Sequence, residues 1–138
     1  MIDSELYQNS KNFIREIKAH MESPLLTELW GDWKGPTWSE GEIIIKQRTV
    51  NKKEPSILAA GVGTTKVGIH TDFIVMDDLN SGNNSATPEA CEKVWRHYQM
   101  NTSILEPEGT IVVIGTRYSE IDVPGRILNI IKEDASDI

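Results

Sequence analysis

Cysteine is nearly absent from this chain of 138 residues, and long apolar runs are absent altogether. The single cysteine, Cys91, excludes an internal disulfide and any zinc site built from several cysteines, which is typical of proteins that fold in a reducing compartment. No apolar run approaches the roughly 20 residues that a membrane-spanning helix needs. The first residues also lack the basic and then apolar order of a signal peptide. We therefore expect a soluble intracellular protein without a membrane anchor.

Positive charge is also scarce. The sequence has 14 Lys and Arg residues against 21 Asp and Glu residues, which gives a formal net charge of −7. Contacts to nucleic-acid phosphates come from clustered lysine and arginine, and here these residues are scattered. This argues against strong autonomous binding to nucleic acid, so any DNA contact has to be local or come from other domains or subunits. The length is that of one ordinary domain, which can bury a core without disulfides or structural metal.

One apolar run ends in two adjacent carboxylates. Residues 73–76, Phe-Ile-Val-Met, predict a short strand that is buried on both faces, and Asp77 and Asp78 follow it directly. In open α/β sheets, side chains just outside the carboxyl ends of strands face the ligand-binding crevice. Magnesium takes oxygen ligands, usually one or two of them from protein carboxylates. The pattern resembles a Walker B element, and the alternative is a solvated Asp-Asp turn.

The first part of the chain predicts two helices. Residues 4–22 carry apolar side chains mostly at helical spacing, with charged residues between them. Ser23 as an N-cap and Pro24 at the first helical position predict a second, shorter helix, which Gly31 ends.

Strands and loops are predicted next. Residues 32–41 predict a loop, whose tryptophans we expect to pack over the edge of the sheet; the alternative is a base-stacking platform. Strands are predicted at residues 42–46 and 56–60. The glycines and the lysine in residues 61–68 lack the spacing of a P-loop, so this segment predicts a glycine-punctuated loop instead.

A second buried-type strand is predicted at residues 110–114, after a turn at residues 106–109. A helix precedes this turn, because Thr87, Pro88 and Glu89 supply an N-cap, a first-position proline and a first-turn acid in order. The side chains expected on its buried face are Cys91, Val94, Trp95 and Tyr98.

Strand, helix and strand in this order predict a βαβ unit. Its crossover is right-handed in nearly all known cases, so we expect two parallel, central and neighbouring strands. Asp77 and Asp78 then lie at the same edge of the sheet as Gly115, Thr116 and Arg117, which follow the second strand. The sequence therefore predicts an α/β fold with a parallel sheet and one crevice lined by both polar clusters.

The order of these segments resembles the ATPase domain of phage terminase large subunits, from about Asn12 to Leu128. The fold implied by this resemblance is a P-loop NTPase-like α/β domain with flanking helices, with residues 1–31 as a helical lead-in and residues 42–131 as the sheet core. The matching segments are Trp38 and residues 55–59, 68–72, 74–79 and 113–118.

The resemblance implies a motor that uses ATP hydrolysis to package double-stranded DNA into a procapsid. Its implied partners are DNA, a portal protein, a small terminase subunit and further copies in a homo-oligomeric ring, in the cytoplasm of an infected bacterial host. The family's Walker A loop lies upstream of the matching motifs, and its nuclease domain lies downstream. The chain is thus expected to correspond to the latter part of an ATPase domain and, by itself, to bind ATP weakly and leave it unhydrolysed.

The resemblance also implies roles for single residues in a site for Mg²⁺ with ATP. Asp77 would hold the magnesium ion, and Asp78 would orient the attacking water, although many such motors carry Glu at that position. Gly115 and Thr116 match the coupling motif, in which the threonine senses the γ-phosphate. Arg117 would anchor this loop or pair with Asp78; an ordinary surface ion pair is its alternative role.

Two alternative functions stay open at this point. The first is a folded interaction module without nucleotide affinity, or a prophage remnant, which the missing phosphate loop favours for the isolated chain. Residues 75–78, Val-Met-Asp-Asp, also resemble the hairpin of reverse transcriptases, which would indicate a palm-type nucleotidyl transferase that uses two metals. A tight hairpin after Asp78 favours the polymerase, whereas a loop and a helix favour the motor.

Overall fold

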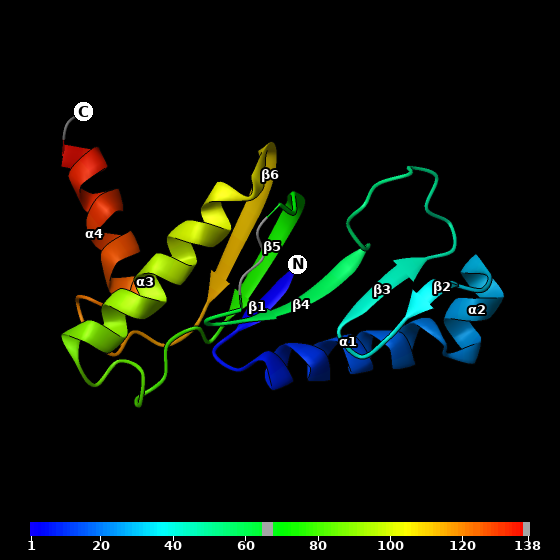
Figure 1. Ribbon diagram of the computed structural model, residues 1–138, viewed down its shortest axis with the longest axis horizontal. Helices are drawn as coiled ribbons and strands as arrows, with labels where there is room; N and C mark the ends of the chain where they lie inside the picture. Colours follow the sequence, from blue (N-terminus) through cyan, green and yellow to red (C-terminus); the bar gives the residue numbers. More distant parts are fainter. Residues whose placement is uncertain (65–67, 137–138) are drawn as a thin grey trace.

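The computed structural model describes residues 1–64 and 68–136 and is a six-stranded mixed sheet with four helices in these residues (Figure 1). The strand order across the sheet is β2-β3-β4-β1-β5-β6. The strands are β1 (Ile2–Ser4), β2 (Lys34–Trp38), β3 (Glu42–Ile45), β4 (Ile57–Gly61), β5 (Thr71–Asp77) and β6 (Leu105–Ile114). The helices are α1 (Tyr7–Met21), α2 (Pro24–Trp30), α3 (Pro88–Ser103) and α4 (Val123–Ser136).

The predicted βαβ unit is confirmed. β5 and β6 are parallel neighbours, with Asp77 opposite Ile114, and α3 connects them. The helix begins where its capping residues predict, because the side chain of Thr87 accepts a hydrogen bond from the backbone N–H of Ala90. β6 starts earlier than predicted, since the expected turn at residues 106–109 lies within the strand.

The predicted α/β fold with a parallel sheet is confirmed in part, because the sheet is mixed. β4, β1, β5 and β6 are parallel, whereas β3 runs antiparallel to both β2 and β4. β2 and β3 form a hairpin closed by Ser39, whose N–H donates to the carbonyl of Glu42. A short connection of this kind joins antiparallel strands, because a parallel pair needs a long crossover.

The predicted loop over residues 32–41 is also wrong, because it contains β2. Gly35 lies so close to β3 that a Cβ atom there would collide with the carbonyl oxygen of Ile44, so glycine permits the pairing. Trp38 packs against the core beneath α1 and donates a hydrogen bond to Glu22, at 3.0 Å. For this tryptophan the expected packing role is confirmed.

Residues 1–31 contain more than the two predicted helices. β1 lies between β4 and β5 and is parallel to both. The position beside the Asp77 strand is therefore filled on both sides. Among the described residues, β2 and β6 form the two edges of the sheet. The prediction that both strands of the βαβ unit are central therefore holds for β5 and is wrong for β6.

Apolar cores lie on both faces of the sheet. Ile74 and Met76 of β5 pack with Val94 of α3 on one face. On the other face Ile14 of α1 packs on Ala59 of β4. α1 covers only part of its face of the sheet, and three large apolar side chains of β5 and β6 remain exposed. These are Phe73, Val112 and Ile114.

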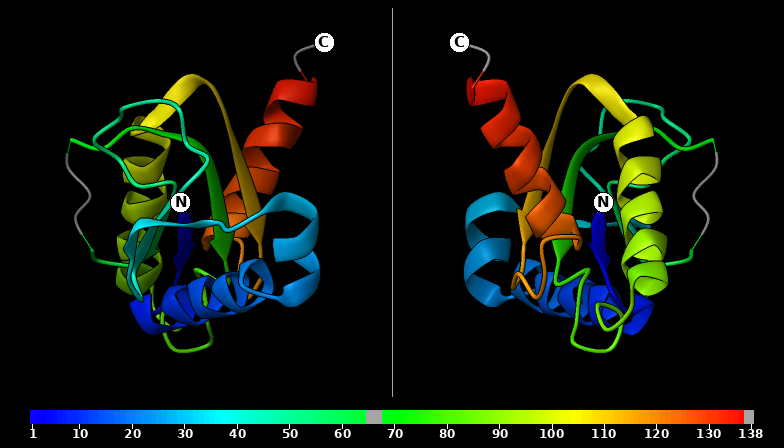
Figure 2. Two further views of the ribbon diagram at one scale, coloured as in Figure 1. Left: turned by 90° about the vertical axis from the view of Figure 1, so that its right-hand side faces the viewer. Right: turned by 90° about the vertical axis from the view of Figure 1, so that its left-hand side faces the viewer.

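The C-terminal helix α4 starts against the α3 side of the core, where Val123 is fully buried. From there it leads away from the sheet to the C-terminus (Figures 1 and 2). Across the described ranges, no helix combines the length and the apolar character needed to cross a membrane.

Candidate functional site

The backbone after β5 is fixed from both neighbouring strands. Asp77 is the last residue of β5, and Asp78 has a positive φ of 44°, a conformation that residues other than glycine seldom adopt. The N–H of Asp78 donates to the carbonyl of Ile114 in β6, at 2.9 Å. Its carbonyl accepts a hydrogen bond from the N–H of Glu5, just after β1, at 3.2 Å. These two bonds hold the chain in a kink that turns Asp78 out of the strand.

The end of β6 lies beside this kink. A Cβ atom at Gly115 would lie 3.4 Å from the Oδ1 atom of Asp78, so the two segments are in contact. Thr116 and Arg117 follow on the same side and are exposed. The guanidinium of Arg117 pairs with Glu120, at 3.6 Å, and not with Asp78. The structure therefore brings Asp78 and the Gly-Thr segment together, whereas Arg117 makes a local surface ion pair.

The two carboxylates carry uncompensated negative charge. Asp77 is partly buried and Asp78 is exposed. Partial burial raises the pKa of Asp77, and the negative charge of Asp78 raises it further. Within residues 1–64 and 68–136, neither carboxylate has a hydrogen-bond or ion-pair partner. A cation bound here would stabilise both charges.

The environment of Asp77 explains its desolvation. An apolar groove of about 170 Å³ lies between α1 and the exposed part of the sheet. Asp77 is the charged residue among the described residues that line it. Its other lining residues are Ile2, Phe13, Ile17, Val75 and Ile114. One side of the Asp77 carboxylate is thus apolar.

The donor set fits some metals and not others. In the part of the chain that the structure describes, no group of three or more His, Cys, Asp or Glu side chains is placed to hold a metal ion. A protein-enclosed zinc or calcium site is therefore not formed by these residues. Magnesium needs only one or two protein carboxylates when waters and phosphate oxygens complete its shell, which Asp77 and Asp78 can provide.

A buried polar cluster connects the end of β5 to β1 and α3. The Ser4 hydroxyl donates to the carbonyl of Asp77, at 2.8 Å, and the Ser4 N–H donates to Oδ1 of Asp3, at 3.0 Å. Oδ2 of Asp3 lies 2.6 Å from Nε2 of His97 and also accepts from the amide of Asn101. Asp3 and Asn101 are fully buried, and His97 nearly so. α3 is thus tied through Asp3 to the residue that holds Asp77.

Sequence reasoning missed this cluster, although one signal was present. His97 and Asn101 continue the buried stripe of α3 that begins at Cys91 and Val94. Polar side chains on a buried helix stripe need partners inside the protein. The partner, Asp3, lies far away in the sequence and could not be identified from spacing.

A second support joins the segments that follow β5 and β6. The buried carboxylate of Asp122 accepts hydrogen bonds from the N–H groups of Tyr118 and Ser119, at 2.6 and 2.9 Å. Asn80, just after the carboxylate pair, accepts from the N–H of Val123 at the start of α4, at 3.1 Å. The loop after Thr116 is therefore anchored to the loop after Asp78.

The polymerase alternative is wrong for this chain. A loop and then α3 follow Asp78, and both neighbours of β5 are parallel to it. A Met-Asp-Asp hairpin needs an antiparallel partner directly after the aspartates. The outcome that favours a motor-like arrangement, a loop and a helix after Asp78, is the one observed.

Comparison with known proteins adds a partial similarity. No protein-family model matches the chain. Over 69 residues, 49% of the chain, it is 33% identical to the large subunit of the terminase of Enterobacteria phage T3. The matched part covers 12% of that protein's length. The chain is thus similar, over about half of its residues, to a small part of a phage terminase large subunit.

Proposed function

We propose that this chain forms one wall of the ATP site in a phage DNA-packaging motor. The observation that carries the proposal is the contact between Asp78 and Gly115 at the carboxyl ends of two parallel strands, β5 and β6. Ligands of open α/β sheets bind at such ends. The partial similarity to a terminase large subunit supports the same function.

Each residue of the site has a role that its surroundings support. Asp77, which is partly buried and has no counter-charge among the described residues, would hold Mg²⁺. Asp78 is exposed on a fixed kink, so its carboxylate can accept a hydrogen bond from a water and orient it. The magnesium nucleotide supplies the phosphoryl group that is transferred to water. Thr116, which follows Gly115 directly, would contact the terminal phosphate.

The phosphate-binding element has to lie beside these residues. The sequence has no Gly-x-x-x-x-Gly-Lys-Ser/Thr loop, whose backbone amides and lysine supply most of the phosphate affinity in P-loop proteins. A further strand that pairs in parallel with the open side of β6 would end at the same side of the sheet as Asp78 and Thr116. We propose this open side of β6, and not a position next to the Asp77 strand, for the element that carries the phosphate loop.

The proposed partners follow from the same function. Double-stranded DNA, a portal protein, a small terminase subunit and further copies in a ring are the partners of such a motor. The net charge of −7 indicates that the DNA-gripping residues belong to other parts of the assembly.

An interaction module without catalysis is the second candidate. The observation that favours it is the surface of α2, where Leu25, Leu29 and Trp30 are each more than 60% exposed. Exposed apolar side chains gathered on one short helix are typical of a surface that contacts another protein. Turnover measurements separate the two candidates.

The test is a fusion that supplies the phosphate loop. The segment of the phage T3 terminase large subunit that precedes the matched region is joined to this chain, and ATP hydrolysis is measured with and without Mg²⁺. We expect magnesium-dependent turnover. Asp78→Asn should abolish turnover and leave nucleotide binding intact, because the charge that orients water is lost while Asp77 remains.

Asp72→Asn is the matched control, since it makes the same chemical change at the other end of β5. We expect its turnover to equal that of the unaltered fusion. Equal turnover with Asn at position 78 would contradict the role of Asp78. A fusion that binds nucleotide and never hydrolyses it would favour the interaction module.

A further inference from the structure

The peptide group between Asp77 and Asp78 is held at both of its polar ends. Its carbonyl oxygen, on Asp77, accepts a hydrogen bond from the Ser4 hydroxyl, at 2.8 Å. Its N–H, on Asp78, donates to the carbonyl of Ile114, at 2.9 Å. The φ of 44° at Asp78 is one that an aspartate seldom adopts unless its surroundings favour it. The orientation of the two carboxylates therefore depends on what holds Ser4 in place.

Ser4 is held from α3, through the side chain of Asp3. The N–H of Ser4 donates to Oδ1 of Asp3, at 3.0 Å. Oδ2 of Asp3 lies 2.6 Å from Nε2 of His97 and also accepts from the amide of Asn101. Ser4 lies opposite Asp77 in the parallel pairing of β1 with β5. A continuous series of contacts thus leads from His97 through Asp3 and Ser4 to the carbonyl of Asp77.

The composition of this cluster indicates a role beyond stability. Asp3 and Asn101 are fully buried, and His97 nearly so. Buried ionisable pairs are often no more stabilising than apolar side chains of similar size. Within the described ranges, the buried Oδ1 atom of Asn101 also lacks a hydrogen-bond partner, which costs further stability. What such a network does supply is a fixed orientation of the elements that it joins, here α3, β1 and the end of β5.

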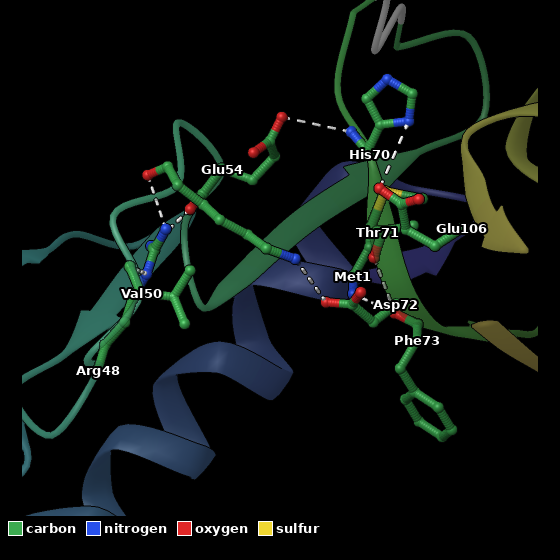
Figure 3. A network of polar contacts seen from close by, with 10 residues as sticks. Met1, Arg48, Val50, Glu54, His70, Thr71, Asp72, Phe73 and Glu106 are labelled. Atoms are coloured by element: carbon green, nitrogen blue, oxygen red, sulfur yellow. Dashed lines mark hydrogen bonds and ion pairs between the residues drawn. The ribbon is translucent and has the colours of Figure 1, made fainter. Parts of the chain in front are cut away.

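The polar network at the amino end of β5 provides an exposed counterpart (Figure 3). There Nδ1 of His70 lies 3.7 Å from Oε1 of Glu106, and Lys52 pairs with Asp72, at 3.5 Å. Because water can replace either partner of an exposed pair, such contacts contribute little to the position of the backbone. The contact of His70 with Glu106 therefore serves as a reference for the buried contact of a histidine with Asp3.

We infer that His97 is a positioning residue for the carboxylate pair, acting through Asp3 and Ser4 on the peptide group between Asp77 and Asp78. Without the donor at His97, Asp3 loses one of the partners that fix its carboxylate. Ser4 then leaves the position from which its hydroxyl reaches the carbonyl of Asp77. The two carboxylates lose the fixed geometry that binding of one cation requires. The use of the site rests on the proposed function, whereas the positioning can be measured without cation or nucleotide.

The first measurement is amide hydrogen exchange in the full chain, with His97→Leu and His97→Gln as variants. The quantity compared is the exchange rate of the Asp78 amide relative to the other amides of β5. We expect this relative rate to rise about tenfold in His97→Leu, as the loss of one net hydrogen bond gives. In His97→Gln the side-chain amide can donate to Asp3 in place of Nε2, so most of the protection should return.

Two control variants separate positioning from general destabilisation. Val94→Ala removes buried packing on the same stripe of α3 and leaves the polar cluster intact. It should lower the urea midpoint without raising the relative exchange rate at Asp78. His70→Leu makes the same substitution at the exposed histidine and should change neither quantity.

The second measurement is the affinity for Mn²⁺, added alone and followed by the broadening of the Asp77 and Asp78 amide signals. We expect about tenfold weaker binding in His97→Leu, the lower end of the range for groups that support metal ligands, and near-normal binding in His97→Gln. Ser4→Ala should have a similar effect to His97→Leu. The double variant should bind no more weakly than either single variant, since both changes act on the same peptide group.

Several results would overturn the inference. An unchanged relative exchange rate at Asp78 in His97→Leu would do so, as would a His97→Gln variant no better than His97→Leu, or additive losses in the double variant. If His97→Leu does not fold, Ser4→Ala carries the same exchange test with the same criterion. An unaltered chain without Mn²⁺ binding at the carboxylate pair would contradict the proposed function, and the exchange rates would still decide on the positioning role.

Discussion

Both ends of β5 carry acidic residues, but these residues differ in whether they have a counter-charge. At the amino end Asp72 is exposed and pairs with Lys52, at 3.5 Å. At the carboxyl end Asp77 and Asp78 have no such partners among the described residues, and the pKa of Asp77 is raised. The backbone that carries the unpaired aspartates is instead held by hydrogen bonds from β1 and β6. The exposed Asp72 thus has a counter-charge, whereas Asp77 and Asp78 have none among the described residues although their backbone is fixed. Carboxylates without a counter-charge on a fixed backbone are typical of a binding site.

The largest expected difference is in the free energy of unfolding when one carboxylate is removed near each end of β5. Asp3→Ala, below the carboxyl end, leaves His97 and Asn101 buried without their acceptor, so the free energy of unfolding should fall by about 3 kcal/mol. Asp72→Ala removes only an exposed ion pair and should cost less than about 1 kcal/mol. Urea unfolding measures both. Equal losses would mean that the buried cluster does not support the carboxyl end.

A close backbone approach at the carboxyl edge gives the next largest effect. A Cβ atom at Gly61, the last residue of β4, would lie 2.5 Å from the backbone nitrogen of Tyr7. Gly61→Ala should therefore lower the free energy of unfolding by about 2 kcal/mol, because the start of α1 has to move. Gly82→Ala is the control, since no atom lies within 4 Å of a Cβ there. A neutral Gly61→Ala would show that this edge is loosely held.

The hydrogen bond of the Ser4 hydroxyl should also contribute to stability at the carboxyl end of β5. Ser4→Ala removes the hydrogen bond to the carbonyl of Asp77 and should cost about 1 kcal/mol. Ser103→Ala removes a hydroxyl bond to the carbonyl of Met100 on the exposed end of α3 and should be nearly neutral. Thermal unfolding compares the two variants. Similar midpoints would indicate that the Ser4 bond adds nothing to the edge.

The smallest expected effect concerns how stability changes with pH, which should have opposite signs for Asp77 and Glu54. Because the folded-state pKa of Asp77 is raised, its contribution to stability is present below the ordinary value of 3.8 and is lost as pH rises through the raised pKa. Asp77→Asn should therefore be the more stable protein near neutral pH, with the difference vanishing in acid.

Glu54, at the amino end, has the opposite sign. A hydrogen bond from its own backbone lowers its pKa, so its contribution is present above the ordinary value of 4.5 and is lost as pH falls through the lowered pKa. Glu54→Gln should then be slightly less stable near neutral pH. Stability measured between pH 2 and pH 7 checks both variants, and parallel curves for the two would refute the assignment of these shifts.

The sequence predicted the part of the fold whose signals are local. α3 was identifiable because Thr87 and Pro88 mark its start, and the apolar run of β5 followed by two aspartates placed the carboxylates at a strand end. The meeting of Asp78 with Gly115 followed from the handedness of the crossover.

Other features depend on contacts that spacing does not encode. β1 has three residues, which is too short for a periodic pattern. β2 contains Gly35 and Pro36, residues that usually indicate a loop, and it exists because β3 accepts a close approach there. The apolar sequence of β6 is that of a central strand, but β6 lies at an edge because β5 is its one neighbour among the described strands. Arg117, whose pairing was left open, finds Glu120 three residues later in the chain.

The most direct test of the central claim compares cation binding at the two ends of β5. Mn²⁺, titrated into the chain with ATP, broadens the NMR signals of nearby backbone amides. We expect early broadening at Asp77, Asp78, Gly115 and Thr116, little change at Asp72, and loss of the effect in Asp77→Asn. Equal broadening at Asp72, or the same broadening in the Asp77 variant, would contradict a cation site at the carboxyl ends of β5 and β6.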